Sequence, residues 1–200
     1  MQRFLLRLAK TVWNLVLKMI KFNVASINCC TEIEGPNKRL TIWFQGCMLH
    51  CKGCCNPTYQ PLEPRNIISL ENLLKIIKNS KEKYGIEGVT YSGGEPTLQQ
   101  NLPILTKKIH KLGLGVISFT GRKYEEVSDV LDGCDVVLDG PYIEEQREQA
   151  RKVLGSTNQR IIILSDRYPN CEEWFFNNAS KEVEINVGDY IIANGDVVFD

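Results

Sequence analysis

The sequence predicts an α/β protein in which helices cover the outside of a parallel sheet. The first observation is that apolar, strand-like segments alternate with helix-like segments from residue 39 to residue 140. The second is that the strand-like segments have apolar cores, as parallel strands need when helices cover the sheet. The third is size, since 200 residues, of which 43% are hydrophobic, are enough for one domain with a proper core.

Each central element follows from its local pattern. Segments 23–28 and 39–44 are predicted strands joined by a turn-rich stretch, and Ser69 is the predicted cap of a helix that runs to about Lys81. Apolar residues then recur at strand or helix spacing along the rest of the central region. The same reasoning predicts strands at 87–92, 114–120 and 135–140, and helices at 101–112 and 124–131.

The pattern changes after a strand-like segment at 160–164. Closely spaced strands are predicted near the C-terminus, separated by glycine-containing turns, at 182–187, 189–194 and 196–199. These strands predict a small antiparallel β appendage. The predicted organisation is therefore an N-terminal helix, a core and this appendage, with the boundaries 1–22, 23–167 and 168–200.

The N-terminal segment is apolar and basic, and no acidic residue occurs before Glu32. On a helix, one face carries Arg3, Arg7, Lys10, Asn14, Lys18 and Lys21. The opposite face is apolar and carries Leu5, Leu8, Val12, Leu15, Val16 and Met19. This pattern predicts a cationic amphipathic helix over residues 3–21, of the kind that lies in a membrane interface or in a partner's groove. The alternative is a helix packed on its own domain.

A membrane span and a signal peptide are both disfavoured in this segment. The longest uncharged run, from Thr11 to Leu17, is too short to cross a bilayer. Lys18 and Lys21 interrupt the apolar region that a signal peptide needs. The prediction is a cytoplasmic protein with peripheral contact at a membrane.

Charge and cysteine content narrow the function. Lys and Arg number 24 together, as do Asp and Glu, so the net charge of zero gives no argument for a nucleic-acid partner. Eight cysteines can indicate a secreted disulfide scaffold, but such scaffolds are usually short chains with small cores. A chain with long apolar segments can form a stable core without disulfides. Metal-bound thiolates in a reducing compartment are therefore the better interpretation.

Cys47, Cys51 and Cys54 form a C-x3-C-x2-C motif directly after a predicted strand. A zinc site would need a fourth ligand, such as Cys55 or Cys30, without the second knuckle that zinc sites usually have. An iron–sulfur cluster differs, because one iron can be left without a protein ligand, and that open position can take a chelating substrate. Glycines at positions 46 and 53 let the backbone curl, since either can take positive φ.

The C-x3-C-x2-C spacing resembles the signature of radical S-adenosylmethionine (SAM) enzymes. The segment YSGGEP at 91–96 is similar to that family's GGE motif, which follows the second strand and meets the methionyl amino group of SAM. The glycines Gly93 and Gly94 allow close approach of the main chain, at the strand end where open α/β folds bind ligands. A side chain at Gly94 is accordingly expected to weaken SAM binding and to leave the cluster intact. The resemblance implies a partial, open (β/α) barrel, a [4Fe-4S] cluster on the three cysteines, and SAM across the strand ends.

A narrower resemblance is to the activating proteins of anaerobic ribonucleotide reductase. It covers roughly residues 25 to 165, and segments 117–127, 136–145 and 155–162 are similar to segments of those proteins. It implies that an electron from the reduced cluster cleaves SAM to methionine and a 5′-deoxyadenosyl radical, which takes hydrogen from a glycine of a partner enzyme. It also implies an electron donor such as flavodoxin or ferredoxin. The sequence departs from the family at Asn37, Cys55 and Pro141.

The residues predicted to contact the cluster or SAM, besides the metal ligands, are Gly53, Cys54, Cys55, Gly93, Gly94, Glu95, Thr120 and Asp139. For Asp139, a ribose or cation contact competes with a simple turn-forming role before Gly140. Cys55 and the pair Cys29–Cys30 are expected mainly to pack, although a redox role for the pair stays open. His50 and His110 are expected to be structural.

Two other functional classes stay open on the sequence. One is a radical SAM enzyme that modifies a small molecule or peptide, which is favoured if the C-terminal strands close over the pocket. The other is a non-enzymatic iron–sulfur or zinc module, which the GGE segment disfavours. No side chain is identified as a general base, so the predicted chemistry belongs to the cluster and SAM.

Overall fold

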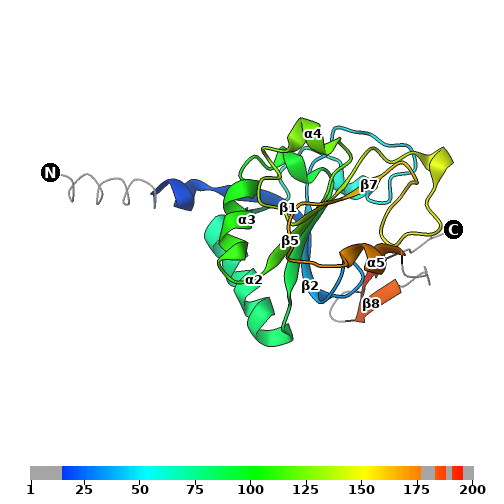
Figure 1. Cartoon of the computed structure of the whole chain (residues 1–200). Helices are drawn as coiled ribbons and strands as arrows, with labels where there is room; N and C mark the ends of the chain where they lie inside the picture. Colours follow the sequence, from blue (N-terminus) through cyan, green and yellow to red (C-terminus); the bar gives the residue numbers. More distant parts are fainter. Residues whose placement is uncertain (1–14, 177–182, 188–190, 196–200) are drawn as a thin grey trace.

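A computed structural model gives the fold and describes residues 15–176, 183–187 and 191–195. The centre of the molecule is a seven-stranded sheet with the order β3-β1-β2-β4-β5-β6-β7 (Figure 1). Its strands are β1 (Lys21–Thr31), β2 (Arg39–Phe44), β3 (Asn66–Ser69), β4 (Gly88–Gly93), β5 (Gly115–Phe119), β6 (Val136–Asp139) and β7 (Arg160–Ile163). The helices are α2 (Leu70–Tyr84), α3 (Leu102–His110), α4 (Tyr124–Val127) and α5 (Cys171–Phe176), and short 3-10 turns are η1 (Pro57–Tyr59), η2 (Pro96–Leu98) and η3 (Glu144–Gln146).

The sheet is parallel at its centre and antiparallel at its edges. Strands β2, β4, β5 and β6 run parallel, whereas β1 and β3 on one side and β7 on the other run antiparallel to their neighbours. The α/β class is thus confirmed. The sheet is open, and its closure into a partial barrel stays a prediction.

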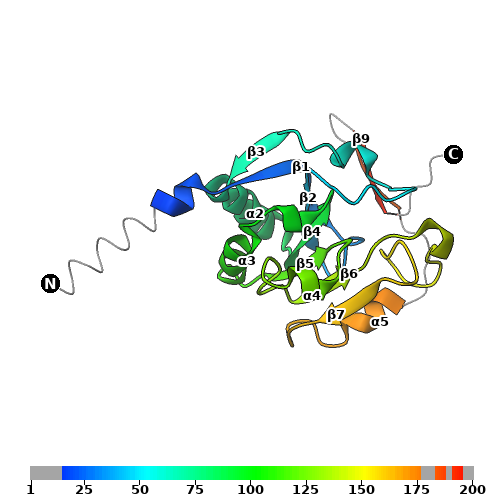
Figure 2. The same cartoon turned by 90° about the horizontal axis from the view of Figure 1, so that it is seen from above.

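Helices α2 and α3 cover one face of the sheet (Figures 1 and 2). Alternate residues of the strands point to this face and join the helices in the main core, for example Val89 and Tyr91 of β4 with Leu73 of α2. The capping role predicted for Ser69 is present, because its hydroxyl accepts a hydrogen bond from the Asn72 N–H at 3.3 Å. The helix ends three residues beyond Lys81, where Gly85 takes the left-handed conformation with φ of 68°.

The other face of the sheet packs on α5, which the sequence analysis did not predict. Phe175 is fully buried there with Tyr168 and Leu154, against Ile117 of β5. The helix has only six residues, so its short apolar run lacks a clear period. The edge strand β3 was also missed, and α4 ends at Val127 rather than at residue 131.

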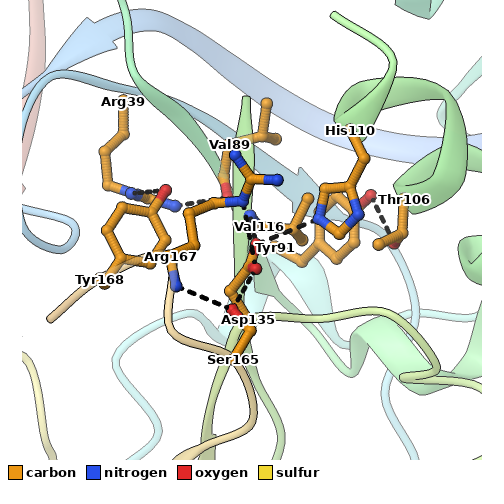
Figure 3. A network of polar contacts seen from close by, with 10 residues as sticks. All are labelled: Arg39, Val89, Tyr91, Thr106, His110, Val116, Asp135, Ser165, Arg167 and Tyr168. Atoms are coloured by element: carbon orange, nitrogen blue, oxygen red, sulfur yellow. Dashed lines mark hydrogen bonds and ion pairs between the residues drawn. The ribbon is translucent and has the colours of Figure 1, made fainter. Parts of the chain in front are cut away.

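The amino ends of the central parallel strands are closed by a buried polar network (Figure 3). The guanidinium of Arg39 is fully buried and donates to Thr90 Oγ1 at 2.7 Å, to the Val89 carbonyl at 2.8 Å and to the Tyr168 hydroxyl at 3.0 Å. Asp135 accepts from the Val116 N–H at 2.7 Å. Burial lowers the pKa of Arg39, and the nearby Tyr168 opposes this change.

Asp135 also accounts for one of the two histidines. Its carboxylate contacts His110 Nε2 at 3.1 Å and Ser165 Oγ at 2.5 Å. His110 therefore lies in the structural network at the amino ends of the strands, as expected (Figure 3).

The N-terminal segment is described only from residue 15. Residues 15–19 are helical, and Leu17 and Ile20 pack on the core, which joins the helix end to β1. The apolar side chains of Leu15, Val16 and Met19 are exposed, by 57%, 43% and 78%. The predicted helix over residues 3–21 therefore ends earlier than expected, at residue 19, because Lys21 already belongs to β1. Residues 3–14 of that prediction lie outside the described residues. No helix in the described part of the chain is long and apolar enough to cross a membrane.

The C-terminal hairpin pairs β8 (Val183–Val187) with β9 (Ile191–Gly195) in antiparallel fashion. It docks beside the end of β1, where the Glu184 carboxylate accepts a hydrogen bond from Thr31 Oγ1 at 2.7 Å. Two strands of the predicted appendage are therefore present, and the one predicted at 196–199 lies outside the described residues.

Candidate functional site

The carboxyl ends of the four parallel strands meet at one edge of the sheet, where a cavity of about 520 Å³ opens. Most residues that the sequence predicted for the site line this cavity. They are Cys47, Cys51, Gly53, Cys54, Cys55, Gly93, Gly94 and Thr120. The cysteine loop after β2 and the glycines that end β4 are far apart in the sequence. The parallel pairing of β2 with β4 brings them together.

The cysteine loop leaves β2 at Phe44 and is closed at its base by backbone hydrogen bonds. The Gly46 N–H donates to the Tyr59 carbonyl at 2.8 Å, and the Cys47 N–H donates to the Gln60 carbonyl at 2.9 Å. Gly46 has φ of +102°, which a glycine adopts without strain. The loop is therefore a closed ring of chain that presents its cysteines to the cavity.

The three motif thiols line the cavity, and two of them accept backbone hydrogen bonds. Backbone N–H groups of Leu49 and Asn56 donate to the sulfurs of Cys47 and Cys54, each at 3.4 Å, and such donors stabilise a thiolate. Burial raises the pKa of the free Cys47 thiol, so this thiol keeps its proton until iron binds and displaces it. No three His, Cys, Asp or Glu side chains in the described part of the chain converge as ligands of a single ion do. The three motif thiols line one cavity, and this donor set fits a [4Fe-4S] cluster, in which each thiolate binds a different iron and one iron keeps an open position.

The other cysteines have different surroundings. All eight are free thiols, so no disulfide scaffold is present. Cys55 is exposed at the cavity, Cys30 packs partly on the core, and burial raises the pKa of Cys134 to about 12. His50, with φ of +50°, lies in the outer turn of the cysteine loop.

The two glycines of the GGE segment are required by the neighbouring chain. A β-carbon on Gly93 would lie 2.5 Å from the Phe44 nitrogen, and one on Gly94 would lie 2.3 Å from the Gly46 carbonyl oxygen. The Glu95 N–H also donates to that oxygen, at 2.8 Å. A side chain at Gly94 would therefore overlap the base of the cysteine loop, so we now expect it to disturb the cluster, which the sequence analysis expected to stay intact.

Glu95 is buried and its carboxylate joins the ends of two strands. One oxygen accepts from the Thr97 hydroxyl at 2.7 Å and from the Thr120 hydroxyl at 2.8 Å, and the other accepts from the Gly121 N–H at 2.9 Å. Glu95 is not among the residues that line the cavity. Its contacts fix the loop after β5, including Thr120, against the end of β4.

Asp139 also lies outside the cavity lining. Its fully buried carboxylate accepts from Arg160 Nε at 2.9 Å and from the Tyr124 N–H at 2.7 Å, so the cation that it contacts belongs to the same chain. The side chain anchors the start of α4 to β7. Hydrogen bonds to Asp139 and Glu125 raise the pKa of Arg160.

The segment after β6, residues 140–159, supplies a wall of the cavity that the sequence analysis did not assign. Tyr142, Arg147, Lys152 and Gln159 line the cavity. Gln159 braces this segment, because its side chain accepts from the Gly155 N–H at 2.8 Å and donates to the Gly140 carbonyl at 2.9 Å. The similarity noted at 155–162 was the available signal, and the structure shows that this stretch builds the wall.

A second brace in this segment is the pair Arg151–Glu148, at 2.6 Å. Arg151 also donates to the Gln159 carbonyl at 2.9 Å. Burial acts to raise the pKa of Glu148, but hydrogen bonds from the Ala150 N–H and the Arg151 guanidinium lower it overall. The segment 140–159 is therefore tied to itself at several points.

Comparison with known proteins identifies a matching family and several similar proteins. The family described as 4Fe-4S single cluster domain matches residues 33–162. The anaerobic ribonucleoside-triphosphate reductase-activating protein of Salmonella typhimurium is 30% identical over 139 residues, which span 64% of this chain and 90% of that protein. The protein of the same name from Enterobacteria phage T4 is 25% identical and covers 72% of this chain and 96% of its own length.

Two further matches are more partial. The pyruvate formate-lyase-activating enzyme of Clostridium pasteurianum is 32% identical, over 60% of this chain and 52% of that enzyme. Among solved structures, QueE from Escherichia coli aligns with a TM-score of 0.47 and 18% identity, over 60% of this chain and 71% of that chain.

Proposed function

Because the chain belongs to the 4Fe-4S single cluster domain family and to the radical SAM activating proteins, we propose that it generates a glycyl radical on a partner enzyme. It is a radical SAM enzyme, and its cofactors are a [4Fe-4S] cluster and SAM. When bound, these cofactors supply the chemistry of reductive SAM cleavage to methionine and a 5′-deoxyadenosyl radical. The proposal assigns the metal ligands as Cys47, Cys51 and Cys54.

The single observation that carries the assignment is that the three motif thiols and the glycines ending β4 line one cavity. The residues of the chain have distinct tasks there. The cysteine loop holds the thiols, and its N–H groups at Leu49 and Asn56 donate to two of the sulfurs. We assign the SAM contacts to the cavity-lining backbone at Gly93 and Gly94 and to Thr120. The walls orient the ligand before reaction.

The proposed partner is a glycyl-radical enzyme such as anaerobic ribonucleotide reductase. Support comes from the names of relatives whose length the chain covers almost completely, at 90% and 96%. The alternative, a small-molecule or peptide substrate, was favoured if the C-terminal strands closed over the pocket. Of this hairpin only the Glu184 side chain is described, and it contacts Thr31 at the end of β1, so the structure adds no support for that alternative.

The test uses anaerobic reconstitution with iron and sulfide. We expect the wild-type protein to bind a cluster and to cleave SAM with a chemical reductant, and we expect Ala at Cys47, Cys51 or Cys54 to abolish cleavage. Cys55→Ala is the matched control and should keep most of the activity. Loss of the cluster in the Cys55 variant alone would show that the ligand assignment is wrong.

The partner is tested separately. Incubation of the reconstituted protein with SAM, a reductant and an anaerobic ribonucleotide reductase should produce a glycyl radical with its electron paramagnetic resonance signal. SAM cleavage without that signal, for every glycyl-radical enzyme tried, would instead support the small-molecule alternative. Replacing the chemical reductant by flavodoxin or ferredoxin tests the proposed electron donor.

For location, we propose a cytoplasmic protein that contacts an anionic membrane surface through residues 3–21. The described end of this segment, residues 15–19, keeps an exposed apolar side while Leu17 and Ile20 fix it to the core. The segment carries five Lys or Arg residues and no acid. Attraction to anionic lipid is worth roughly 1 kcal/mol per basic residue near the surface, so five can hold a protein there reversibly.

Co-sedimentation with vesicles tests this location. The full chain should sediment with phosphatidylserine vesicles at low salt and dissociate at high salt, and a chain lacking residues 1–19 should not sediment. Such a deletion keeps the buried Ile20 and should preserve SAM cleavage. Unfolding or cluster loss in the truncated chain would show that the helix belongs to the core.

A further inference from the structure

The outer turn of the cysteine loop, which contains Lys52 and Gly53, contacts the segment 140–159 across the rim of the cavity. Lys52, between the second and third motif cysteines, forms an ion pair with Glu144 at 2.8 Å and lies 3.6 Å from a Glu145 carboxylate oxygen. Gly53, with φ of +71°, lies so close that a β-carbon there would be 2.9 Å from Glu144 Oε1. The two segments therefore touch next to the motif thiols.

These two segments differ in how they are held. The segment 140–159 is braced internally by Gln159 and by Arg151, and its start is held by a hydrogen bond from the Gly140 N–H to the Arg122 carbonyl at 3.0 Å. Backbone hydrogen bonds close the cysteine loop at Gly46 and Cys47, and the ion pair of Lys52 adds a contact farther along the loop. The pair Lys52–Glu144 thus connects the outer turn to a rigid arm.

Both sides of this connection face the same cavity. Cys51 and Gly53 line it from the cysteine loop, and Tyr142 and Arg147 line it from the arm. Separation of Lys52 from Glu144 would widen the rim beside the cluster ligands. We propose that Lys52 and Glu144 are positioning residues, which latch the cysteine loop to the 140–159 arm and so restrict access of solvent and oxidants to the cluster.

The size of the effect follows from exposure. The side chains of Lys52 and Glu144 are 79% and 41% exposed, so the pair is screened by water and salt. Exposed pairs contribute little to stability, so we expect the ratio of latched to open forms to change by no more than about fivefold. The latch therefore changes access by a few-fold and leaves overall stability almost unchanged.

The proposal rests on the cluster but not on the identity of the partner, so it is tested on the reconstituted protein alone. Cluster loss on exposure to air is followed by the decay of iron–sulfur absorbance at low ionic strength. Lys52→Met and Glu144→Gln should each lose the cluster about two- to fivefold faster than wild type. Lys38→Met is the matched control, because Lys38 forms a surface pair with Glu32 at 3.9 Å, and it should decay at the wild-type rate.

Two rescues separate a latch from a merely structural lysine. Lys52→Arg and the exchanged pair Lys52→Glu with Glu144→Lys should both restore slow decay, and 0.5 M salt should raise the wild-type rate to that of Lys52→Met. An unchanged decay rate in Glu144→Gln, which alters no residue of the cysteine loop itself, would overturn the proposal. So would an exchanged pair that decays as fast as the single variants. Failure of wild type to take up a cluster would instead contradict the proposed function.

Discussion

The parallel strands begin at one side of the sheet, here called the amino edge, and end at the other, the carboxyl edge. Glycines have different roles at these two edges. At the amino edge, the first residues of β4 and β5 are Gly88 and Gly115, and β-carbons there would lie 2.4 and 2.2 Å from the Tyr168 hydroxyl. A large side chain thus fills the space that the glycines leave. At the carboxyl edge, Gly94 leaves space for the backbone of the cysteine loop, whose thiols face an open cavity.

The amino edge contributes to stability, whereas the carboxyl edge carries the candidate site. The amino edge is sealed by Arg39, Tyr168 and Asp135, whose polar groups are paired with one another or with strand backbone (Figure 3). The carboxyl edge keeps a cavity of about 520 Å³ between loops that carry the motif residues. Changes at the amino edge should therefore act on folding, and changes at the carboxyl edge should act first on the cluster and on SAM.

The largest effect is expected at Gly94. Gly94→Val should prevent cluster assembly although it alters no ligand, because its β-carbon would overlap the carbonyl oxygens of Gly46 and Tyr59 at 2.3 and 2.7 Å. We expect at least tenfold less bound iron after anaerobic reconstitution. Gly85→Ala is the control: its φ of +68° strains the helix end, but a β-carbon there meets no atom within 4 Å, so the variant should bind iron normally. Normal iron content with weakened SAM binding in Gly94→Val would mean that the loop base can move aside.

The second effect tests the sealed edge. Arg39→Met should lower the free energy of unfolding by about 3 kcal/mol or more, since it leaves buried acceptors on Thr90 and Val89 without a donor, at a cost of about 1–3 kcal/mol each. Denaturant unfolding measures this change, with the exposed Lys78→Met as control. The folded fraction should still bind a cluster. Loss of the cluster without loss of stability would contradict the separation of the two edges.

The third effect concerns the link between β4 and β5. Glu95→Gln should destabilise the protein by about 1–3 kcal/mol, because an amide NH2 cannot accept from all the donors that the carboxylate now satisfies. SAM affinity should also fall, through displacement of Thr120. Calorimetry with the reconstituted protein measures that affinity, and Glu87→Gln on the surface is the control. Weaker SAM binding at unchanged stability would indicate direct contact between Glu95 and SAM.

The smallest effect is expected at Arg160, which is half-exposed at 48%. Arg160→Met should lower the free energy of unfolding by less than the changes at Arg39 and Glu95, since water can reach the Asp139 carboxylate once the guanidinium is gone. SAM affinity should not change, because neither residue lines the cavity. A marked fall in SAM affinity would show that Asp139 acts on the ligand after all.

The sequence alone determined the features that depend on short stretches of chain. The spacing of Cys47, Cys51 and Cys54 is local and defines a loop of three thiols whatever surrounds it. The alternation of strands and helices is likewise local, and it predicted the parallel centre of the sheet. Short elements such as β3 and α5 were not predicted, because four or six residues are too few to establish a periodic pattern of apolar residues.

Only the tertiary structure decided what the strand ends touch. Glu95 and Asp139 are each a single acidic residue after a strand, and nothing nearby in sequence shows that one holds Thr120 and the other Arg160. Those partners come from strands β5 and β7, whose positions depend on the order and register of the whole sheet. The demand for glycine at position 94 has the same origin, because the parallel pairing of β4 with β2 brings it against the cysteine loop.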